Sequence, residues 1–559
     1  MSELQSPLYL LRRLITLESE DLITLIAYGV GIGVMSLATP IAVQTLVNTV
    51  AFGALFQPLV VLTIILLVLV GFSNALAGLQ FYVMDMLQRR VFVRLFGEVA
   101  TRLQQAHITS GDHHHLPELV NRFLDVVNLN KAAMIILLET LGYLLQALIG
   151  MILLAFYHPL LLAFDIFLIA TLAFILLILG KNGIKTAIAQ SKAKYETLAW
   201  LENIAATPIV SKSATATAFL TAKTDRLAQK YLTACTEHFR VLSRQNTSAL
   251  ILHALANTLL LGLGGWMVIE RQLSLGQLIA AELVVSNMMY GLIRLGKTLA
   301  NFYALIVSAD KMSHLLDIPQ ESSRAGMVKM TDEPYKVDVH RLSLPESPNL
   351  DVLREFELHL KAREHLVISE GANRGSLLDV LYGLREPSSG YVQINHHDFR
   401  DLNLSLLRDS VSLVRDAEII DASVLDNLRL NRELELSVLW DVLAEVGLQE
   451  IVAALSDGLN HHLSMNGAPL TTEQGLRLTL ARAIVGQPKL LLLDGVLDRI
   501  DQRVLPRLLD YLLAEDAPWT LVVTSHQPNI IARCQRHARI EKGVLVEIPV
   551  NGLVDNDAK

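Results

Sequence analysis

Long apolar segments follow one another through the amino-terminal half of the chain. A helix needs about 20 apolar residues to cross the hydrocarbon core of a bilayer. Six segments reach this length, at about residues 22–48, 57–82, 132–156, 159–180, 247–269 and 275–300. The pattern therefore predicts a helical membrane domain with six spans.

Basic residues predict how these spans are oriented. They gather before the first span, after the second, between the fourth and fifth, and at the end of the sixth: Arg12, Arg13, Arg89, Arg90, Arg94, Lys181, Lys185, Lys192, Lys194, Arg240, Arg244, Arg294 and Lys297. The loops AFGALF and FYHP carry no Lys or Arg, and the third outer loop carries only Arg271. Because positive charge stays on the cytoplasmic side, we expect a multi-pass protein of the inner (cytoplasmic) membrane with both termini in the cytoplasm.

The cytoplasmic segments between spans are long, at about residues 83–131 and 181–246. Apolar residues recur three and four apart in HLPELVNRFLDVVNL and AKYETLAWLENIA, which predicts helices that continue the spans into the cytoplasm. Such extensions suit a pump that is driven from the cytoplasmic side. Helical insertions with no coupling role are the alternative.

Three acids lie within predicted spans, Glu139, Asp165 and Glu282. A charge at membrane depth is costly and faces a cavity or a partner. A path for a cationic or polar cargo is one interpretation. Structural pairing with helix-end groups or a second protomer is the other, and we favour it because no base lies inside the spans. The adjacent His113, His114 and His115 favour a solvated loop over a metal site, since neighbouring loop residues rarely converge on one ion.

The pattern of apolar and polar residues changes near residue 330. Short apolar runs alternate with helical stretches, as in a parallel sheet with crossover helices. We therefore predict a membrane domain at 1–315, a linker at 316–332, an α/β domain at 333–550 and a tail at 551–559. The net charge of −8 gives no indication of nucleic-acid binding.

Several motifs of the second domain occur in a familiar order: HLVISEGANRGSLLDVLYGL, SVLDNLRL, GAPLTTEQGLRLTLARAIVGQPKLLLLD and LVVTSHQP. They resemble the ATP-binding-cassette (ABC) family, with a P-loop cassette behind the six spans of a half-exporter. The membrane part is similar to haemolysin-type exporters of type I secretion. The resemblance implies a dimer in membrane lipid, ATP and magnesium as cofactors, a possible periplasmic adaptor, and a peptide, protein or hydrophobic cargo.

The phosphate loop departs from the pattern G-x-x-x-x-G-K-[ST], in which glycine amides, a lysine and a hydroxyl hold phosphate and magnesium. Ile368 stands at the first glycine position, Arg374 at the lysine and Gly375 at the hydroxyl, while Ser376 comes one place late. Arginine does not replace a compact ammonium. Glu370 adds negative charge beside Gly371. A plain strand-to-helix turn and a weak nucleotide site formed by Gly371, Arg374, Gly375 and Ser376 are both open.

The signature loop L-S-G-G-Q, which holds the partner's γ-phosphate, corresponds to Leu470–Gln474. Thr471 keeps a hydroxyl, but both glycines are absent and Glu473 would face the phosphate. Like charges about 4 Å apart repel by roughly 4 kcal/mol at a surface-like dielectric. Thr471 and Gln474 also form a T-x-x-Q pattern, which predicts a helix capping box.

The remaining positions are mixed. Asp494 matches the magnesium-binding aspartate of the family, but Gly495 stands where the general base belongs and has no side chain to polarise water. By the same resemblance, His526 matches the switch histidine, Asp501 the aspartate of the dimer-contact loop, Asp416 the γ-phosphate-sensing glutamine and Leu344 the adenine-stacking aromatic.

Both halves of a composite cassette site are thus altered, so neither a homodimer nor a heterodimer with another ABC half-transporter would restore two complete sites. We expect an exporter-type transport subunit with a pseudo-ATPase cassette. A non-transporting membrane scaffold or regulator is an alternative. A second alternative is a working half-transporter, in which Arg374 replaces the phosphate-loop lysine and another residue replaces the general base.

Overall fold

The computed structural model describes residues 7–51, 56–107, 120–321, 332–344, 353–369 and 374–549. The chain forms two compact units, Met1–Gln320 and Glu321–Lys559. Glu370, Gly371, the histidine triplet at 113–115 and the tail from 551 lie outside the described residues. The exact domain limits stay predictions.

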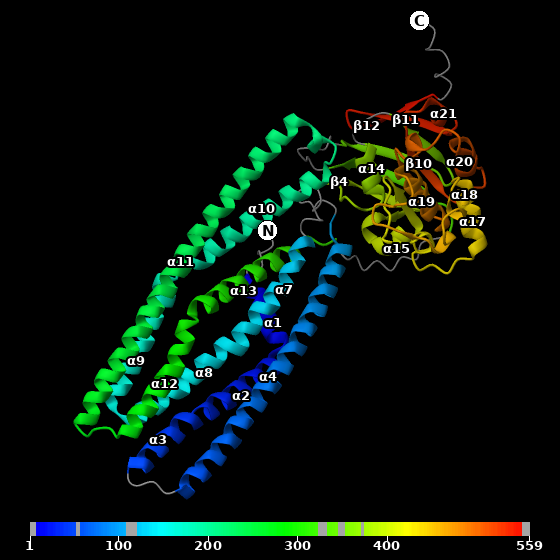
Figure 1. The fold of residues 1–559 in the computed structure, drawn as a ribbon. Helices are drawn as coiled ribbons and strands as arrows, with labels where there is room; N and C mark the ends of the chain where they lie inside the picture. The colour runs from blue at the N-terminus through cyan, green and yellow to red at the C-terminus, as the bar shows by residue number, and fades with distance from the viewer. Residues whose placement is uncertain are drawn as a thin grey trace. The chain divides into compact units, whose positions relative to one another are not determined.

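Long helices make up the amino-terminal unit (Figure 1). They are α1 (Pro7–Leu17), α2 (Ser19–Ser36), α3 (Ala38–Ala51), α4 (Phe56–Gln104), η1 (Arg122–Leu124), α7 (Asp125–Ile135), η2 (Ile136–Thr140), α8 (Leu141–Tyr157), α9 (Pro159–Ala173), η3 (Phe174–Leu179), α10 (Gly183–Ala206), η4 (Val210–Lys212), α11 (Ala214–Ile269), α12 (Leu275–Ile293) and α13 (Leu295–Leu316). The segments η2 and η3 are π-helical turns: η2 interrupts the third span and η3 ends the fourth.

Six helical segments among the described residues are long and apolar enough to cross a membrane: Ser19–Thr49, Phe56–Gln104, Arg122–Tyr157, Pro159–Leu179, Ala214–Ile269 and Leu275–Ile293. Each overlaps one predicted span. At 1.5 Å per residue, α4 and α11 are roughly 74 and 84 Å long, more than twice the thickness of a hydrocarbon core. These helices therefore continue well beyond the membrane, as the periodicity predicts.

Local sequence signals mark where several helices begin. Ser274 and Gln277 form a capping box at the start of α12, and Ser213 accepts a hydrogen bond from the Ala216 amide at the start of α11. Pro159 occupies the first turn of α9. The helix of the sixth span ends at Ile293, earlier than its apolar run predicts, because Arg294 leaves helical geometry with φ −90° and ψ 2°.

The carboxyl-terminal unit is an α/β domain. Its strands are β1 (Val337–Ser343), β2 (Phe356–Leu360), β3 (His365–Ile368), β4 (Ser389–Ile394), β5 (His397–Asp398), β6 (Val411–Val414), β7 (Ala422–Ser423), β8 (His462–Leu463), β9 (Leu490–Asp494), β10 (Thr520–Thr524), β11 (Arg536–Glu541) and β12 (Val544–Ile548). The larger sheet has the order β12-β11-β3-β10-β9-β6 in the described residues, and its strands are parallel except for β12 at one edge. A second, antiparallel sheet has the order β2-β1-β4-β5.

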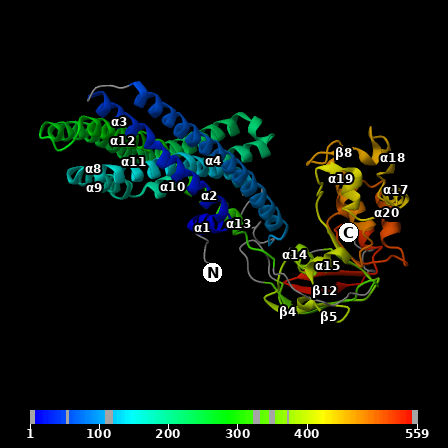
Figure 2. The ribbon, with the colours of Figure 1, turned by 90° about the horizontal axis from the view of Figure 1, so that it is seen from below.

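The helices of this unit are α14 (Arg374–Leu381), η5 (Phe399–Asp401), α15 (Leu404–Ser410), α16 (Val424–Arg429), α17 (Leu436–Glu445), α18 (Gln449–Ala453), η6 (Gly458–Asn460), α19 (Thr472–Val485), η7 (Leu497–Arg499), α20 (Leu505–Leu512) and α21 (Pro528–Ile531). Figure 2 shows α17, α18 and α19 gathered at one end of the unit, away from β4 and β5. The leucines of β9 are fully buried, alternately in the core that includes α19 and α20 and in the core that includes α14. β9 is therefore a central strand, as its unbroken apolar run predicts.

Candidate functional site

The carboxyl ends of neighbouring parallel strands meet at one edge of the larger sheet. Thr524 of β10 pairs in register with Asp494 of β9, and Val414 of β6 pairs with Leu493. Arg415, the residue after Val414, therefore comes beside Asp494. Ligands of open α/β sheets bind outside this edge, which makes it the place to look for a site.

Arg415 holds two carboxylates together. Its Nε donates to Oδ2 of Asp494 at 2.6 Å, and its Nη2 donates to Oδ1 of Asp379 at 2.8 Å. The second oxygen of each acid is also engaged. Thr524 Oγ1 donates to Oδ1 of Asp494 at 2.8 Å, and Arg385 Nε donates to Oδ2 of Asp379 at 2.9 Å. All four carboxylate oxygens thus have a partner within the chain.

The charges of this cluster balance, since Arg415 and Arg385 offset Asp379 and Asp494. Partial burial by itself would lower the pKa of Arg415, but its hydrogen bonds and attraction to Asp379 and Asp494 outweigh this and raise the pKa above its ordinary value. The guanidinium is therefore positively charged at neutral pH. The free negative charge that would attract a cation to Asp494 is already neutralised.

Gly375 lies against the same cluster. Its carbonyl oxygen accepts from Arg415 Nη2 at 3.2 Å. A Cβ at this position would lie 3.2 Å from Asp494 Oδ2 and 3.5 Å from Arg415 Nη2. The serine or threonine of an intact phosphate loop would therefore crowd the Arg415 ion pair, so the loss of the hydroxyl at 375 and the presence of Arg415 are consistent with each other.

The other residues predicted to hold phosphate or to stack on adenine give less support for a nucleotide site. Ile368 and Ser376 are buried, and Leu344 packs in the core with Leu353 and Tyr335. A side chain packed in the core cannot stack on an adenine ring. For Arg374 the structure describes only the backbone, which begins α14.

Gly495 follows Asp494 with a left-handed backbone, φ +64°. Its amide donates to Thr524 Oγ1 at 2.8 Å, which holds the turn against β10. A Cβ added at Gly495 would meet no atom within 4 Å, so space is open at this position although the backbone favours glycine.

The acid at the γ-phosphate-sensing position is paired within the chain. Asp416 Oδ1 accepts from Arg499 Nη1 at 2.9 Å, and Arg499 also donates to the carbonyl oxygens of Arg415 and Gly495. Arg499 thereby ties the segment after β6 to the turn after β9. Both ends of this tie lie next to Asp494.

The switch histidine and the dimer-contact aspartate lie on the neighbouring turns. His526 is exposed, and its backbone amide donates to Asp498 at 3.2 Å. Asp501 Oδ1 accepts from the amide of Arg503 at 2.9 Å, which closes a local turn. The described structure brings Asp494, Gly495, Asp498 and the segment at 524–526 together.

The signature segment is a helix start. Thr471 Oγ1 accepts from the Gln474 amide at 3.2 Å, and Gln474 Oε1 accepts from the Thr471 amide at 2.9 Å. The predicted capping box at the first turn of α19 is present. Both side chains that were expected to contact nucleotide are therefore engaged in the architecture of α19.

Glu473 is also engaged within the chain. Its Oε2 accepts from Nη2 of the buried Arg477 at 2.9 Å, and its Oε1 accepts from the Asp501 amide at 3.2 Å. Arg477 continues to the carbonyl oxygens of Val446 and Gly447, at 3.1 and 2.7 Å. Through these contacts Glu473 and Arg477 link α19, the end of α17 and the turn at 501, while an orientation of Glu473 toward a phosphate stays a prediction.

Magnesium nucleotide can be tested against this arrangement. A magnesium ion prefers near-octahedral oxygen ligands and is held by one or two carboxylates. Asp494 Oδ2 already accepts from the Arg415 guanidinium, and a divalent cation about 4 Å from a unit positive charge is repelled by roughly 8 kcal/mol near a surface. In this arrangement the described residues do not fit a metal ion at Asp494.

The sequence analysis missed Arg415, Asp379 and Arg499. Arg415 directly follows a buried strand, as Asp494 does, and that shared position was the available signal. Its significance depends on the lateral neighbours of β6, which a single sequence does not give.

The three membrane acids differ in their contacts within the described part of the chain. Glu139 pairs with Lys297 Nζ at 3.2 Å and lies 3.7 Å from Arg294 Nη1. Asp165 is buried, and neither of its carboxylate oxygens has a hydrogen-bond partner in the described residues. Glu282 Oε2 likewise lacks one there.

Comparison with known proteins agrees with the geometry. The family described as "ABC transporter" matches residues 353–497. The alpha-hemolysin translocation ATP-binding protein HlyB of Escherichia coli is 26% identical over 296 residues, which cover 51% of this chain and 41% of HlyB. The exotoxin translocation ATP-binding protein PaxB of Pasteurella aerogenes is 23% identical over 528 residues, which cover 92% of this chain and 73% of PaxB.

A solved structure of a bacterial Atm1-family ABC exporter with ATP bound has the same fold, with a TM-score of 0.82 at 15% identity over 95% of each chain. The chain spans less than half the length of the first curated relatives it matches, with 23% of the ABC-type transporter fsqE of Aspergillus fumigatus and 41% of HlyB. The predicted fold class and the resemblance to ABC exporters are confirmed. An ABC transporter domain implies ATP binding, usually with magnesium.

Proposed function

We propose that this chain, which has the fold of an ABC exporter and carries an ABC transporter domain, is a membrane transport subunit whose own nucleotide site does not hydrolyse ATP. The observation that carries this proposal is the ion pair from Arg415 to Asp494 and Asp379. It places a protein cation where a hydrolytic site requires a metal ion.

Two further features support loss of hydrolysis. Phosphoryl transfer depends on a metal ion that neutralises developing charge and on a group that orients the attacking water. Gly495 supplies no such group. The carboxylate of Asp416 is paired with Arg499 and that of Asp494 with Arg415, so neither of these two acids is free to act as a substitute.

Nucleotide binding by this chain would then be weak or absent. Gly371, Arg374, Gly375 and Ser376 are the residues from which a contact would come, with Thr471, Gln474 and Asp501 facing a second protomer. Any conformational response of this chain to ATP would then occur without hydrolysis at this site. Hydrolysis itself would have to come from an intact partner.

Relatives suggest the setting. HlyB and PaxB are named as translocation proteins for a hemolysin and an exotoxin, so we propose export of a protein, peptide or hydrophobic cargo. The placement of basic residues supports an inner-membrane protein with cytoplasmic termini. We propose that it works as a homodimer or as a heterodimer with another ABC half-transporter, with a periplasmic adaptor as a further partner.

Steady-state ATP turnover by the full chain in lipid nanodiscs tests the proposal, with Asp494→Asn as the matched control. We expect the wild-type rate to equal the rate of the control. A wild-type rate at least tenfold above Asp494→Asn would contradict the proposal and favour a working half-transporter.

The scaffold alternative needs a separate readout. Cysteine pairs placed in the long cytoplasmic extensions can report distances by spectroscopy with and without ATP, alone and with an intact half-transporter. A nucleotide-dependent change in the mixed dimer supports a transport subunit. No change, together with normal transport by the partner alone, favours a scaffold.

A further inference from the structure

A cavity of about 420 Å³ lies among the helices of the third, fourth and sixth spans. Its walls come from η2, α8, α9, η3, α12 and α13, with Gln245 of α11 at one side. The lining is almost wholly apolar and includes the flexible side chains of Met151, Met288 and Met289. Its size falls in the range of about 300–1,000 Å³ that is typical of small-molecule sites.

Two π-helical turns form part of its wall. Ile136 and Thr140 belong to η2 in the third span, and Leu176 and Leu177 belong to η3 in the fourth. π-Turns are rare and are frequent at functional sites. Here each turn widens its helix where the helix faces the cavity.

Thr140 contributes a buried hydroxyl to the wall. Thr140 Oγ1 is buried and has no hydrogen-bond partner among the described residues. By contrast, Thr63, Thr101 and Thr171 each donate to the carbonyl oxygen four residues earlier, at 2.9 Å. Gln245 and Tyr303, which also line the cavity, are bonded to each other at 3.1 Å. Thr140 therefore offers a hydrogen bond to a bound molecule.

A charged cluster lies beside the cavity. The lining residue Tyr143 accepts a hydrogen bond from Arg294 Nη1 at 3.1 Å, and Lys297 and Arg294 flank Glu139. Two cations and one acid leave a net charge of +1. The side chains of Arg294 and Lys297 are 40% and 54% exposed, so their remaining donors can be reached.

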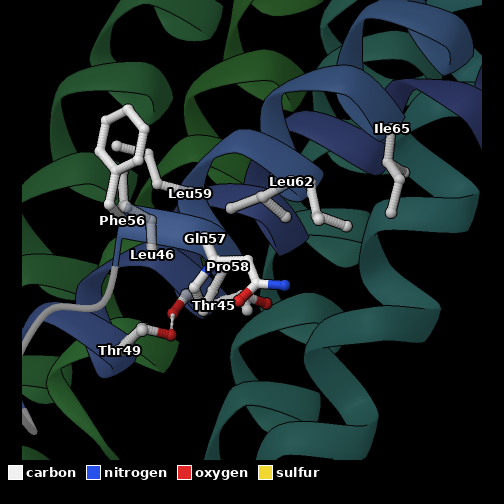
Figure 3. A pocket seen from close by; sticks show the side chains of 10 residues that line it. Thr45, Leu46, Thr49, Phe56, Gln57, Pro58, Leu59, Leu62 and Ile65 are labelled. Carbon is white, nitrogen blue, oxygen red and sulfur yellow. Dashed lines mark hydrogen bonds between the residues drawn. The ribbon is translucent and has the colours of Figure 1, made fainter.

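A larger hollow in the same unit lacks these features. About 690 Å³ lies between the ends of α3 and α4, where Figure 3 shows the side chains that line it. The hydroxyls of Thr45 and Thr49 both donate to backbone carbonyl oxygens of α3, at 2.9 and 2.7 Å. The smaller cavity is therefore the better candidate for a specific ligand.

We propose that this cavity binds the acyl chain of an anionic amphiphile, a fatty acid or an anionic lipid, whose head group lies at Arg294 and Lys297. In a bilayer an acyl chain gains little by moving from lipid to an apolar cavity, because both surroundings are apolar. Selectivity must therefore come from the head group and from Thr140. The inference goes beyond the proposed function, and it holds whether or not the cassette turns over ATP.

Displacement of the fluorescent fatty acid dansylaminoundecanoic acid from the full chain in phosphatidylcholine nanodiscs tests the head-group claim. We expect saturable probe binding and displacement by dodecanoate. Dodecanol and dodecyltrimethylammonium should be at least tenfold weaker competitors. Equal competition by the three, or stronger competition by the cation, would overturn the proposal.

Variants locate the site. Ala147→Phe fills the cavity and should weaken binding at least tenfold, whereas Leu148→Phe, on the exposed face of the same helix, should not change it. Arg294→Gln with Lys297→Gln should weaken binding about tenfold, with the exposed Lys185→Gln as control. Unchanged binding in both cavity and charge variants would refute the site.

Glu139→Gln should change anion affinity in the opposite direction, which distinguishes an effect on binding from structural damage. It releases both cations, so anion binding should tighten several-fold, whereas a structural role alone predicts weaker or equal binding. Thermal unfolding of each variant must match that of its control.

Mass spectrometry of lipids that copurify with the protein distinguishes the sources. A fatty acid or an anionic phospholipid, lost in Ala147→Phe and retained in Leu148→Phe, supports the proposal and identifies the source. Zwitterionic lipid alone in both variants would contradict it.

Discussion

Arg415 places a permanent positive charge at the edge of the sheet, between Asp494 and Asp379. Because it follows a buried strand directly, its backbone position is set by the register of β6 against β9. Its guanidinium matches two carboxylates in a planar geometry that lysine does not reproduce. The residue is a structural tie between the two carboxylates, and under the proposed function it would also keep a metal ion away from Asp494.

Replacing Arg415 with glutamine tests this dual role. Asp494 and Asp379 would lose a shared partner, and the free energy of unfolding should fall by about 1–3 kcal/mol, the cost of leaving buried polar groups unpaired. Magnesium with ATP should then raise the melting temperature of Arg415→Gln more than that of the wild type. Equal shifts in the two proteins would mean that Arg415 does not block the metal position.

Gly495 allows a second test. Glutamate here would restore a carboxylate at the general-base position, and no atom lies within 4 Å of the added Cβ. The left-handed backbone should reduce stability by about 1–2 kcal/mol in Gly495→Glu and equally in Gly495→Ala. We expect no ATP turnover in either variant, because Arg415 still occupies Asp494. Turnover by Gly495→Glu alone would show that Arg415 is easily displaced.

At the scale of single elements, the segment at the signature-loop position forms the capped start of α19. Its first turn is closed by Thr471 and Gln474, and its Glu473 anchors the buried Arg477. We expect Thr471→Ala to cost about 1 kcal/mol through loss of the cap. Thr472→Ala, at the exposed neighbour, should cost much less. Chemical denaturation of the three proteins measures the difference.

Glu473→Gln tests a different contact of the same helix, the ion pair with Arg477. The buried Arg477 would lose its counter-charge, so we expect a loss of about 1–3 kcal/mol in stability. A gain in stability would mean instead that Glu473 is held under repulsion. The matched change Glu433→Gln, on an exposed loop of the same unit, should have little effect.

The sequence predicts elements better than it predicts the site. Apolar runs and their periodicity suffice for the six membrane helices and for β9, because burial and hydrocarbon thickness impose them residue by residue. The capping box follows from Thr471 and Gln474 alone, since it is local. The Arg415 ion pair does not, because it joins residues about 35 and 80 positions apart through strand order and register. The contact of Glu473 with the Asp501 amide could not be predicted for the same reason, since the two residues are distant in sequence.

At the scale of the whole molecule, the two units have separate hydrophobic cores. Leu154, Leu260 and Val285 belong to a core of the amino-terminal unit, while Leu443, Leu480 and Trp519 belong to one of the cassette. Domains with their own cores can unfold independently. A probe placed in one unit therefore measures the unfolding of that unit and not of the other.

Cys534 provides such a signal. Burial raises the pKa of its thiol to about 12, so the thiolate that reacts with alkylating reagents is scarce at pH 8. In Cys235→Ser, we expect iodoacetamide to label Cys534 only when denaturant unfolds the cassette. Full labelling in native buffer would show that the cassette opens readily.

Manganese can replace magnesium in an oxygen-ligand site and is visible by electron paramagnetic resonance, so it tests the occupancy of Asp494 directly. We would titrate Mn²⁺ with a non-hydrolysable ATP analogue into the wild type, Arg415→Gln and Asp494→Asn. The account predicts that the wild type binds no more metal than Asp494→Asn, while Arg415→Gln gains a site. One tight Mn²⁺ per wild-type chain, lost in Asp494→Asn, would contradict it.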